Sequence, residues 1–384
     1  MCHKSDERGF ALVAAVFGLV IIAALVTGAF FAARQEMSVG RSSQGFQRAF
    51  GAAEAGLNNT IVQWNTGSWN GLAVGDSASV SGTLPGNTGS YAGAVRRLNN
   101  ELFVIRSVGQ DPTGSTQRTL AALARLLLIQ MNFQASLSTR GSLKLGGSSL
   151  IDGRNSSPAG WTCPTASDTL PGVMTNNTGL IETAGCTPTA GNYSCIIGNP
   201  DVIADPTITD STFFKFGDVD WLELVAMATK VYPTGNIGPL NDIGPVGDAT
   251  TCNTAILSNW GEPGVSPTGT ILVAGCRNYF PIIYVNGDLK LTGGRGQGIL
   301  LVERNLEVQG GFEFYGPVIV RGVFSTSGTG GHFNGGVMAA NVNLATSSVL
   351  GNAVITYSSC AVAQALRYNA PGRLLAQRSW AELF

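Results

Sequence analysis

The stretch "IIYVNGDLKLTGGRGQGILLVERNLEVQGGFEFYGPVIVRGVFST", residues 282–326, repeats one pattern at an interval of about 18 residues. In each copy the second, fourth, eighth and tenth places are apolar or Thr, and glycine-rich breaks separate the copies. Successive side chains of a strand point to opposite sides, so these places share one face. The pattern predicts a parallel β-solenoid, in which each rung stacks on the next at about 4.8 Å.

Other parts of the chain carry the same pattern. Copies begin at Ser136, Ile282, Ile299 and Pro317, a fifth from Gly335 fits with a one-residue slip, and a sixth begins at Ala353. The side chains expected to point inward are Leu137, Thr139, Leu143, Leu145, Ile283, Val285, Leu289, Leu291, Leu300, Val302, Leu306, Val308, Val318, Val320, Phe324 and Thr326. Lys290 and Glu307 then become neighbours on the outer face, which favours an ion pair.

The first copy is separated from the others by a long segment that is rich in cysteine. We therefore assign residues 135–152 and 282–360 to the solenoid and 153–281 to an inserted lobe, which contains Trp161, Trp221 and Trp260. The cysteines expected to form disulfides are Cys163, Cys186, Cys195, Cys252, Cys276 and Cys360. Their even number suits an oxidising compartment, but sequence does not choose the pairs, and free buried thiols are the alternative. No CxxC pair suggests zinc.

The N-terminus begins with charged residues and a glycine, "ERGFALVAAV" at 7–16, followed by an uncharged run from Phe10 to Ala33. A helix of this length spans a bilayer, whereas a secretory signal has only about 7–15 apolar residues. Cleavage near Thr27–Ala29 and a plain single-span anchor are the alternatives. The cysteines place the long C-terminal part outside the cytoplasm.

The helical pattern continues beyond the apolar run. Apolar residues recur among polar ones at Met37, Phe46, Phe50, Ala53 and Leu57. This spacing is typical of an amphipathic helix, so we expect one helix over 10–65.

The leader ending in Gly9, the apolar helix from Phe10 and "QRAFGAAEAGL" at 47–57 resemble the type IV pilin superfamily, and within it the PilX-type minor pilins. In that family a prepilin peptidase removes the leader at the inner membrane and methylates the new N-terminal residue. The helix then packs against those of other pilin subunits. The resemblance implies a leader at 1–9 and a methylated Phe10, and it covers about residues 1–65.

One departure from the major pilins concerns the fifth residue of the mature chain. Major pilins have glutamate there, whereas this chain has Ala14. PilX-type subunits and the tip pseudopilins of the general secretion pathway also lack it, which the resemblance connects with priming or capping a filament. An unpaired carboxylate in lipid is costly, so a subunit without one needs no partner at that position. We take Ala14, Phe50 and Glu54 as marker residues of the filament helix.

Residues 66–134 are expected to form a small α/β head. Strand-like segments within 90–132 are separated by Asn99–Asn100 and by "DPTGS" at 111–115, which predicts a small antiparallel sheet. The last segment, "TQRTLAALARLLLIQM" at 116–131, is also compatible with a helix. Residues 361–384 are expected to cap the open end of the solenoid. The fold class is thus α+β: a long helix, a small antiparallel sheet and a parallel solenoid with a disulfide-rich insertion.

Catalytic groups are sparse in this sequence. His332, in a glycine-rich stretch expected to turn, is the only histidine beyond the leader, so a Ser-His-Asp or Cys-His site has no support. Outward acids of the solenoid are scattered, and Asp218, Asp220 and Glu223 are explained by the start of a helix near Asp218. We expect no enzyme activity, cofactor or metal. The net charge of −1 gives no reason to expect nucleic acid as a partner.

These observations favour a non-enzymatic PilX-like minor pilin or pseudopilin. It would span the inner membrane once before assembly, with its bulk periplasmic or extracellular, and then prime or cap a type IV pilus or type II secretion-like filament. Its solenoid would be displayed at the tip for adhesion to a surface glycan or to a host or abiotic surface. The alternative is a membrane-anchored β-helix protein of the cell envelope that binds or cleaves polysaccharide. In it, the solenoid face and the tryptophans of the inserted lobe, Trp161, Trp221 and Trp260, would contact the glycan.

Overall fold

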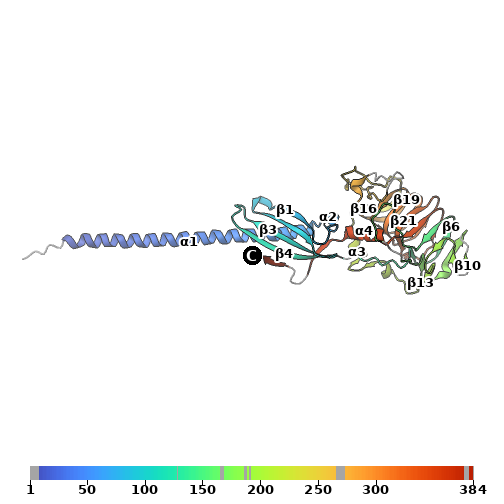
Figure 1. The fold of residues 1–384 in the computed structure, drawn as a ribbon, viewed down its shortest axis with the longest axis horizontal. Coiled ribbons are helices and arrows are strands. Elements are labelled where there is room, and N and C mark those ends of the chain that lie inside the picture. Colours follow the sequence, from blue (N-terminus) through green and yellow to red (C-terminus); the bar gives the residue numbers. More distant parts are fainter. Residues whose placement is uncertain are drawn as a thin grey trace, which may run out of the picture. The chain divides into compact units, whose positions relative to one another are not determined.

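A computed structural model describes residues 8–127, 129–164, 168–185, 188–189, 192–264, 273–375 and 380–383 (Figure 1). The chain divides into two units. The helix–sheet unit contains residues 1–64, 72–125 and 373–384, and the solenoid unit contains residues 65–71 and 126–372. Of the head expected over 66–134, residues 66–71 and 126–134 therefore belong to the solenoid unit.

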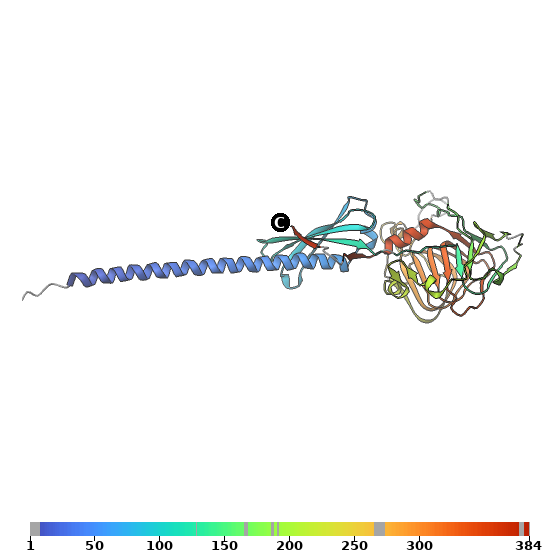
Figure 2. The same ribbon diagram turned by 90° about the horizontal axis from the view of Figure 1, so that it is seen from below.

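Helix α1 (Arg8–Val62) dominates the helix–sheet unit and runs without interruption for 55 residues (Figure 2). It contains no proline, and its Ala- and Leu-rich sequence has high helix propensity. At 1.5 Å per residue it is about 80 Å long. The single helix expected over 10–65 is confirmed.

Four consecutive strands form the antiparallel sheet of this unit: β1 (Ser77–Thr83), β2 (Ser90–Arg97), β3 (Leu102–Gln110) and β4 (Gln117–Leu126). The segment whose state the sequence left open is a strand, because β4 pairs with β3 along its length, from Gln117 opposite Gln110 to Arg125 opposite Leu102. Two short C-terminal strands, β24 (Gly372–Leu374) and β25 (Trp380–Leu383), also pair with β4. The final segment thus belongs to this sheet and does not cap the solenoid as expected.

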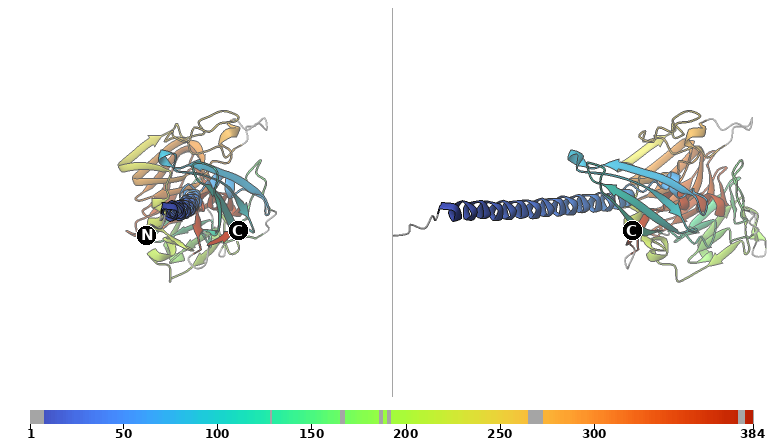
Figure 3. Two further views of the ribbon diagram at one scale, coloured as in Figure 1. Left: turned by 90° about the vertical axis from the view of Figure 1, so that its left-hand side faces the viewer. Right: turned by 60° about the vertical axis from the view of Figure 1, so that its left-hand side comes forward.

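The C-terminal half of α1 packs on β2 and β3, as the right-hand view of Figure 3 shows. Ala49, Ala52, Ala53 and Leu57 are buried there. Small side chains allow the close approach: a Cβ added at Gly109 of β3 would lie 2.1 Å from the backbone oxygen of Ala49. The amphipathic pattern therefore ends in a tight helix–sheet contact.

Parallel strands in the solenoid unit pair in three columns, and long strands bend at corners to enter more than one column. The first column contains, in stacking order, β16 (Lys230–Leu240), β17 (Ile282–Gln297), β18 (Ile299–Val302), β19 (Leu306–Val320), β21 (Gly331–Ala339), β5 (Leu137–Thr139), β8 (Val173–Thr175) and β13 (Val202–Ala204). The second contains β16, β17, β19, β20 (Phe324–Thr326), β22 (Ser347–Val349), β6 (Leu143–Gly146) and β9 (Ile181–Ala184). The third contains β17, β19, β21, β23 (Val354–Tyr357), β7 (Leu150–Asp152) and β12 (Ile196–Ile197).

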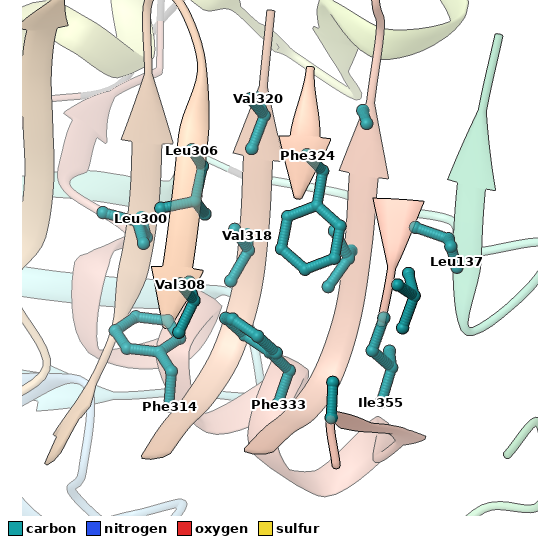
Figure 4. Close-up of a cluster of buried hydrophobic side chains, with 14 of the residues drawn as sticks. Leu137, Leu300, Leu306, Val308, Phe314, Val318, Val320, Phe324, Phe333 and Ile355 are labelled. Atoms are coloured by element: carbon teal, nitrogen blue, oxygen red, sulfur yellow. The ribbon is translucent and has the colours of Figure 1, made fainter. Parts of the chain in front are cut away.

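The predicted repeat corresponds to the rungs of this solenoid. Leu289 pairs with Leu306, 17 residues later, and Leu306 pairs with Phe324, 18 residues later. All the side chains expected to point inward are buried, and Figure 4 shows many of them projecting from neighbouring strands into one interior. The corners use glycine where φ is positive, for example at Gly294 and Gly298.

The order of the rungs differs from the order expected. The rung at 137–152 does not stack on the one at 282–297; it stacks on the rung at 337–357. Strand β23 forms the third side of that rung, so the copy expected to begin at Ala353 is not a separate rung. Rungs with similar inward side chains can stack on one another in any order, and the linear pattern does not encode the order.

The segment 153–281 is not a lobe beside the solenoid throughout its length. Its residues 173–204 extend the stack beyond the rung at 137–152, and its residues 230–240 form the rung at the opposite end. The chain between them carries β14 (Lys215–Phe216), β15 (Val219–Asp220) and α3 (Trp221–Ala226). The short hairpin β10 (Pro188–Thr189) and β11 (Asn192–Tyr193) lies in the same segment.

The first column is buried on its outer side as well. Leu301 and Ile319 are fully buried although they alternate with inward residues. Phe213 and Leu224 from the returning chain and Val362 from α4 (Ser359–Asn369) pack in the same cluster. Burial on both faces explains why "ILLV" and "PVIV" are continuous apolar runs.

Two disulfides join distant parts of the solenoid unit, Cys163 to Cys360 and Cys252 to Cys276. Cys195 is also disulfide-bonded, and Cys186 lies outside the described residues. The cysteines within the described residues beyond α1 therefore act as cross-links rather than as free buried thiols.

Candidate functional site

The first half of α1 is the largest uncovered apolar surface among the described residues. Leu25 and Phe31 are 68% and 69% exposed, and other large apolar side chains from Leu12 to Val39 are similarly open to solvent. The helix is long and apolar enough to cross a membrane. A signal sequence meets the same criterion, so this property alone does not choose among a signal, an anchor and an assembly helix.

The residues that the sequence singled out on this helix have different surroundings. Ala14 and Glu54 are exposed, and Phe50 is half-buried where the helix meets the sheet. Gly9 and Phe10 lie within α1, while their side-chain surroundings and the leader residues 1–7 lie outside the described structure. The structure does not bring these five residues together, because they spread along one helix.

Arg118 contacts α1 at Phe46, where the exposed half of the helix meets the sheet. The guanidinium of Arg118 on β4 lies 3.0 Å from the ring centre of Phe46, and it also pairs with Glu382 of β25 at 3.0 Å. Phe46 remains 41% exposed. The C-terminal strand is therefore connected to α1 through one arginine.

Charged side chains on the outer face of the solenoid pair across neighbouring rungs. Lys290 lies 3.3 Å from Glu307, as the sequence predicted. Arg304 pairs with Asp288 at 3.6 Å. Glu303 binds the Arg321 guanidinium in the same way. Exposed pairs of this kind contribute little free energy of folding, but they occupy the acids that a hydrolytic site would need.

The sequence positions considered for chemistry have structural explanations. The Asp220 carboxylate caps α3 by accepting a hydrogen bond from the backbone N–H of Glu223 at 2.9 Å, and the Glu223 carboxylate accepts one from the backbone N–H of Asp220. His332 lies on strand β21 with its side chain exposed, and not in a turn as expected. Among the described residues, no group of three or more His, Cys, Asp or Glu side chains is placed to hold a metal ion.

Two of the three tryptophans considered for glycan contact are in the interior. Trp260 is fully buried against Tyr232, and Trp221 is buried beside Phe214. Contact of Trp221 and Trp260 with a glycan is therefore contradicted, because both side chains are packed inside the protein. Trp161 alone is half-exposed.

A small cavity beside Trp161 brings together residues that sequence reasoning did not connect. Its lining includes Arg277, Phe280, Gln364 and Tyr368. Burial lowers the pKa of the Arg277 guanidinium. Only the tryptophan carried a sequence signal, because the lining residues come from three distant segments.

Comparisons with known proteins give little beyond this geometry. No family model matches the chain, and no curated protein matches it. The solved structures that match include a pilin. It is the competence-associated pilin ComZ from Thermus thermophilus, at 13% sequence identity and a TM-score of 0.26, over 88% of this chain and 97% of that chain. This likeness is too low to carry an argument about fold or function.

Proposed function

We propose that this protein is a non-enzymatic, PilX-like minor pilin or pseudopilin, which primes or caps a type IV pilus or type II secretion-like filament. The observation that carries the proposal is α1. Its first half is apolar on all sides and uncovered, and without a break it enters a second half that packs on an antiparallel sheet. Such a helix needs lipid before assembly and other helices after it.

The N-terminal residues give this proposal its direction. Gly9 precedes Phe10 at the start of the apolar run, where a prepilin peptidase would cut and methylate. Ala14 offers no carboxylate to a neighbouring subunit, which suits a subunit at the end of a filament. The proposed partners are other pilin subunits, prepilin peptidase and the inner membrane.

The solenoid unit supports a role in display rather than in catalysis. Its outer acids at 288, 303 and 307 are paired with cations across rungs, and its disulfides suit an extracytoplasmic location. We propose that it is carried at the filament tip and takes part in adhesion. Cleavage of polysaccharide is not proposed, since no observation favours it.

The decisive experiment is mass spectrometry of the protein recovered from membranes, in cells with and without prepilin peptidase. We expect a chain that begins at a methylated Phe10, and we expect the intact leader in cells without the enzyme. Gly9→Leu should block processing, because it places a bulky side chain directly at the proposed cut. Gly18→Leu is the matched control, since a Cβ at Gly18 meets nothing within 4 Å.

The outcomes separate the alternatives for the apolar run. A chain that retains Met1 in normal cells would support a plain anchor, and a chain cut near Ala29 would support a signal peptide. Either result would overturn the filament proposal. Recovery of the processed protein in sheared filaments is the expected second result.

A further inference from the structure

A cavity of about 190 Å³ opens on the surface of the solenoid unit. Three chain segments form its walls: residues 160–162, residues 277–280 and the face of α4 that carries Gln364 and Tyr368. The two α4 residues are four positions apart, so they lie on the same side of the helix. A cavity of about 150 Å³ holds one benzene ring, so this volume admits one six-membered ring.

The two disulfides for which both cysteines are described adjoin these walls. Cys163 follows Thr162 directly and is bonded to Cys360, one helical turn before Gln364. Cys276 precedes Arg277 directly and is bonded to Cys252. All three walls are therefore anchored covalently, which keeps the conformational entropy lost on binding small.

Aromatic contacts and hydrogen bonds hold the walls against one another. The rings of Phe280 and Tyr368 stack with centres 4.9 Å apart, and Trp161 meets Phe280 edge to face at 5.6 Å. The Trp161 indole donates a hydrogen bond to the backbone oxygen of Pro263 at 2.6 Å. The Asn369 amide donates to the oxygen of Phe280 at 2.8 Å. The cavity is consequently formed before any ligand arrives.

The one cation in the lining is already engaged. Arg277 donates hydrogen bonds to the backbone oxygens of Glu262, Pro263 and Gly160, and its guanidinium lies 4.8 Å from the ring centre of Trp161. These bonds use three of the five N–H groups of the guanidinium, so a carboxylate or phosphate would find at most two of them. The cavity is thus suited to a neutral ligand.

Four polar side chains of the lining have no hydrogen-bond partner within the described structure: Thr162, Asn278, Gln364 and Tyr368. Amides and hydroxyls both donate and accept, which matches the hydroxyl groups of a sugar. The faces of Phe280 and Tyr368 stack on each other, and Trp161 contacts Tyr315 and Arg277, so the apolar contribution of these rings to the wall comes from their remaining surface. Charge, size and hydrogen-bonding capacity agree on the same class of ligand.

We propose that this cavity binds one neutral sugar residue of a glycan. The inference rests on the proposed function for its setting, since it names the ligand class that a displayed solenoid would recognise. The lining residues Asn278 and Gln364 supply the hydrogen bonds, and Trp161, Phe280 and Tyr368 supply the apolar wall.

The test uses the full chain in a sugar-free detergent, with isothermal calorimetry and saturation-transfer NMR. The probes are methyl glycosides of glucose, galactose, mannose, N-acetylglucosamine and N-acetylgalactosamine, with the anionic N-acetylneuraminic acid for comparison. At least one neutral glycoside should bind and the anionic one should not. Asn278→Ala and Gln364→Ala should each weaken binding about fivefold to tenfold, the effect of losing one hydrogen bond.

Matched controls are Asn236→Ala on β16 and Gln309→Ala on β19, which remove exposed amides outside the cavity. Both controls should bind like the wild type. The absence of binding by every neutral glycoside would overturn the proposal, and so would equal binding by the cavity and control variants. Preferred binding of the anionic sugar would also contradict it. These results are independent of processing at Phe10, so failure here leaves the filament proposal standing.

Discussion

Small residues at the helix–sheet contact show how single positions determine packing in this protein. A Cβ at Gly109 would lie 2.1 Å from the oxygen of Ala49 and 2.2 Å from the nitrogen of Ala53. A Cβ at Gly56, on the facing helix, would lie 2.2 Å from the hydroxyl oxygen of Ser107. Glycine is needed at Gly109 because the strand lies against the helix backbone, and at Gly56 because the side chains of Ser107 and Tyr91 occupy the space of a Cβ.

We predict that Gly109→Ala destabilises the helix–sheet unit by about 1–3 kcal/mol, the usual effect of overpacking. Gly51→Ala is the control, because a Cβ there meets nothing within 4 Å and alanine favours the helix by about 1 kcal/mol. Hydrogen exchange of the β3 amides measures both effects. Equal exchange rates in the two variants would contradict the close contact.

At the scale of elements, the alternation of apolar residues predicted which side chains of the solenoid strands point inward, but it did not decide whether β4 is a strand or a helix. The pattern assigned the inward residues of β18 and β20 correctly, because alternation depends only on neighbours in the sequence. The state of β4 could not be assigned in this way. Its alanines and leucines suit either structure, and pairing with β3 decides for a strand.

We predict that Phe324→Ala lowers the free energy of unfolding of the solenoid unit by about 3–5 kcal/mol, because it leaves a cavity in a closely packed interior. Phe324 is fully buried next to Phe333, with ring centres 5.4 Å apart. The neighbouring Ser325 points outward, so Ser325→Ala should change stability by at most about 0.5 kcal/mol. Denaturant titration compares the two. A large effect of the serine change would contradict the assignment of the inner face.

At the scale of the whole molecule, the rung that comes first in the sequence, 137–152, stacks on the rung that comes last, 337–357, and this contact joins the two halves of the solenoid. The stack begins at 230–240, ends at 202–204, and has residues 337–357 next to 137–152 at its middle. The chain thus builds one half, returns along the outside, and builds the other half toward the starting rung. This closing contact is between residues about 200 positions apart in the sequence.

We predict that cysteines at Lys144 and Ser348 form a disulfide, because these residues are register partners on stacked strands. Paired strands are about 4.8 Å apart, which suits a disulfide. The control pair, Lys144 with Lys290, would be adjacent if rungs stacked in sequence order. Peptide mapping by mass spectrometry distinguishes the two variants. Cross-linking of the control pair alone would contradict the observed order.

The sequence by itself determined most of the elements: the uninterrupted apolar helix, strands β2 and β3 of the antiparallel sheet and the inward face of each rung. These follow from periods of two or about 3.6 residues, which neighbouring side chains impose locally. Strand β1 was not expected, and the state of β4 was left open. Of the residues that line the candidate cavity, the sequence singled out only Trp161, because the others come from distant segments. Tertiary structure alone decided the order of the rungs, the pairing of the cysteines and the return of the C-terminal strand to β4. Rungs with similar apolar interiors can stack on one another in any order, so only contacts between distant parts of the chain fix the order that is formed.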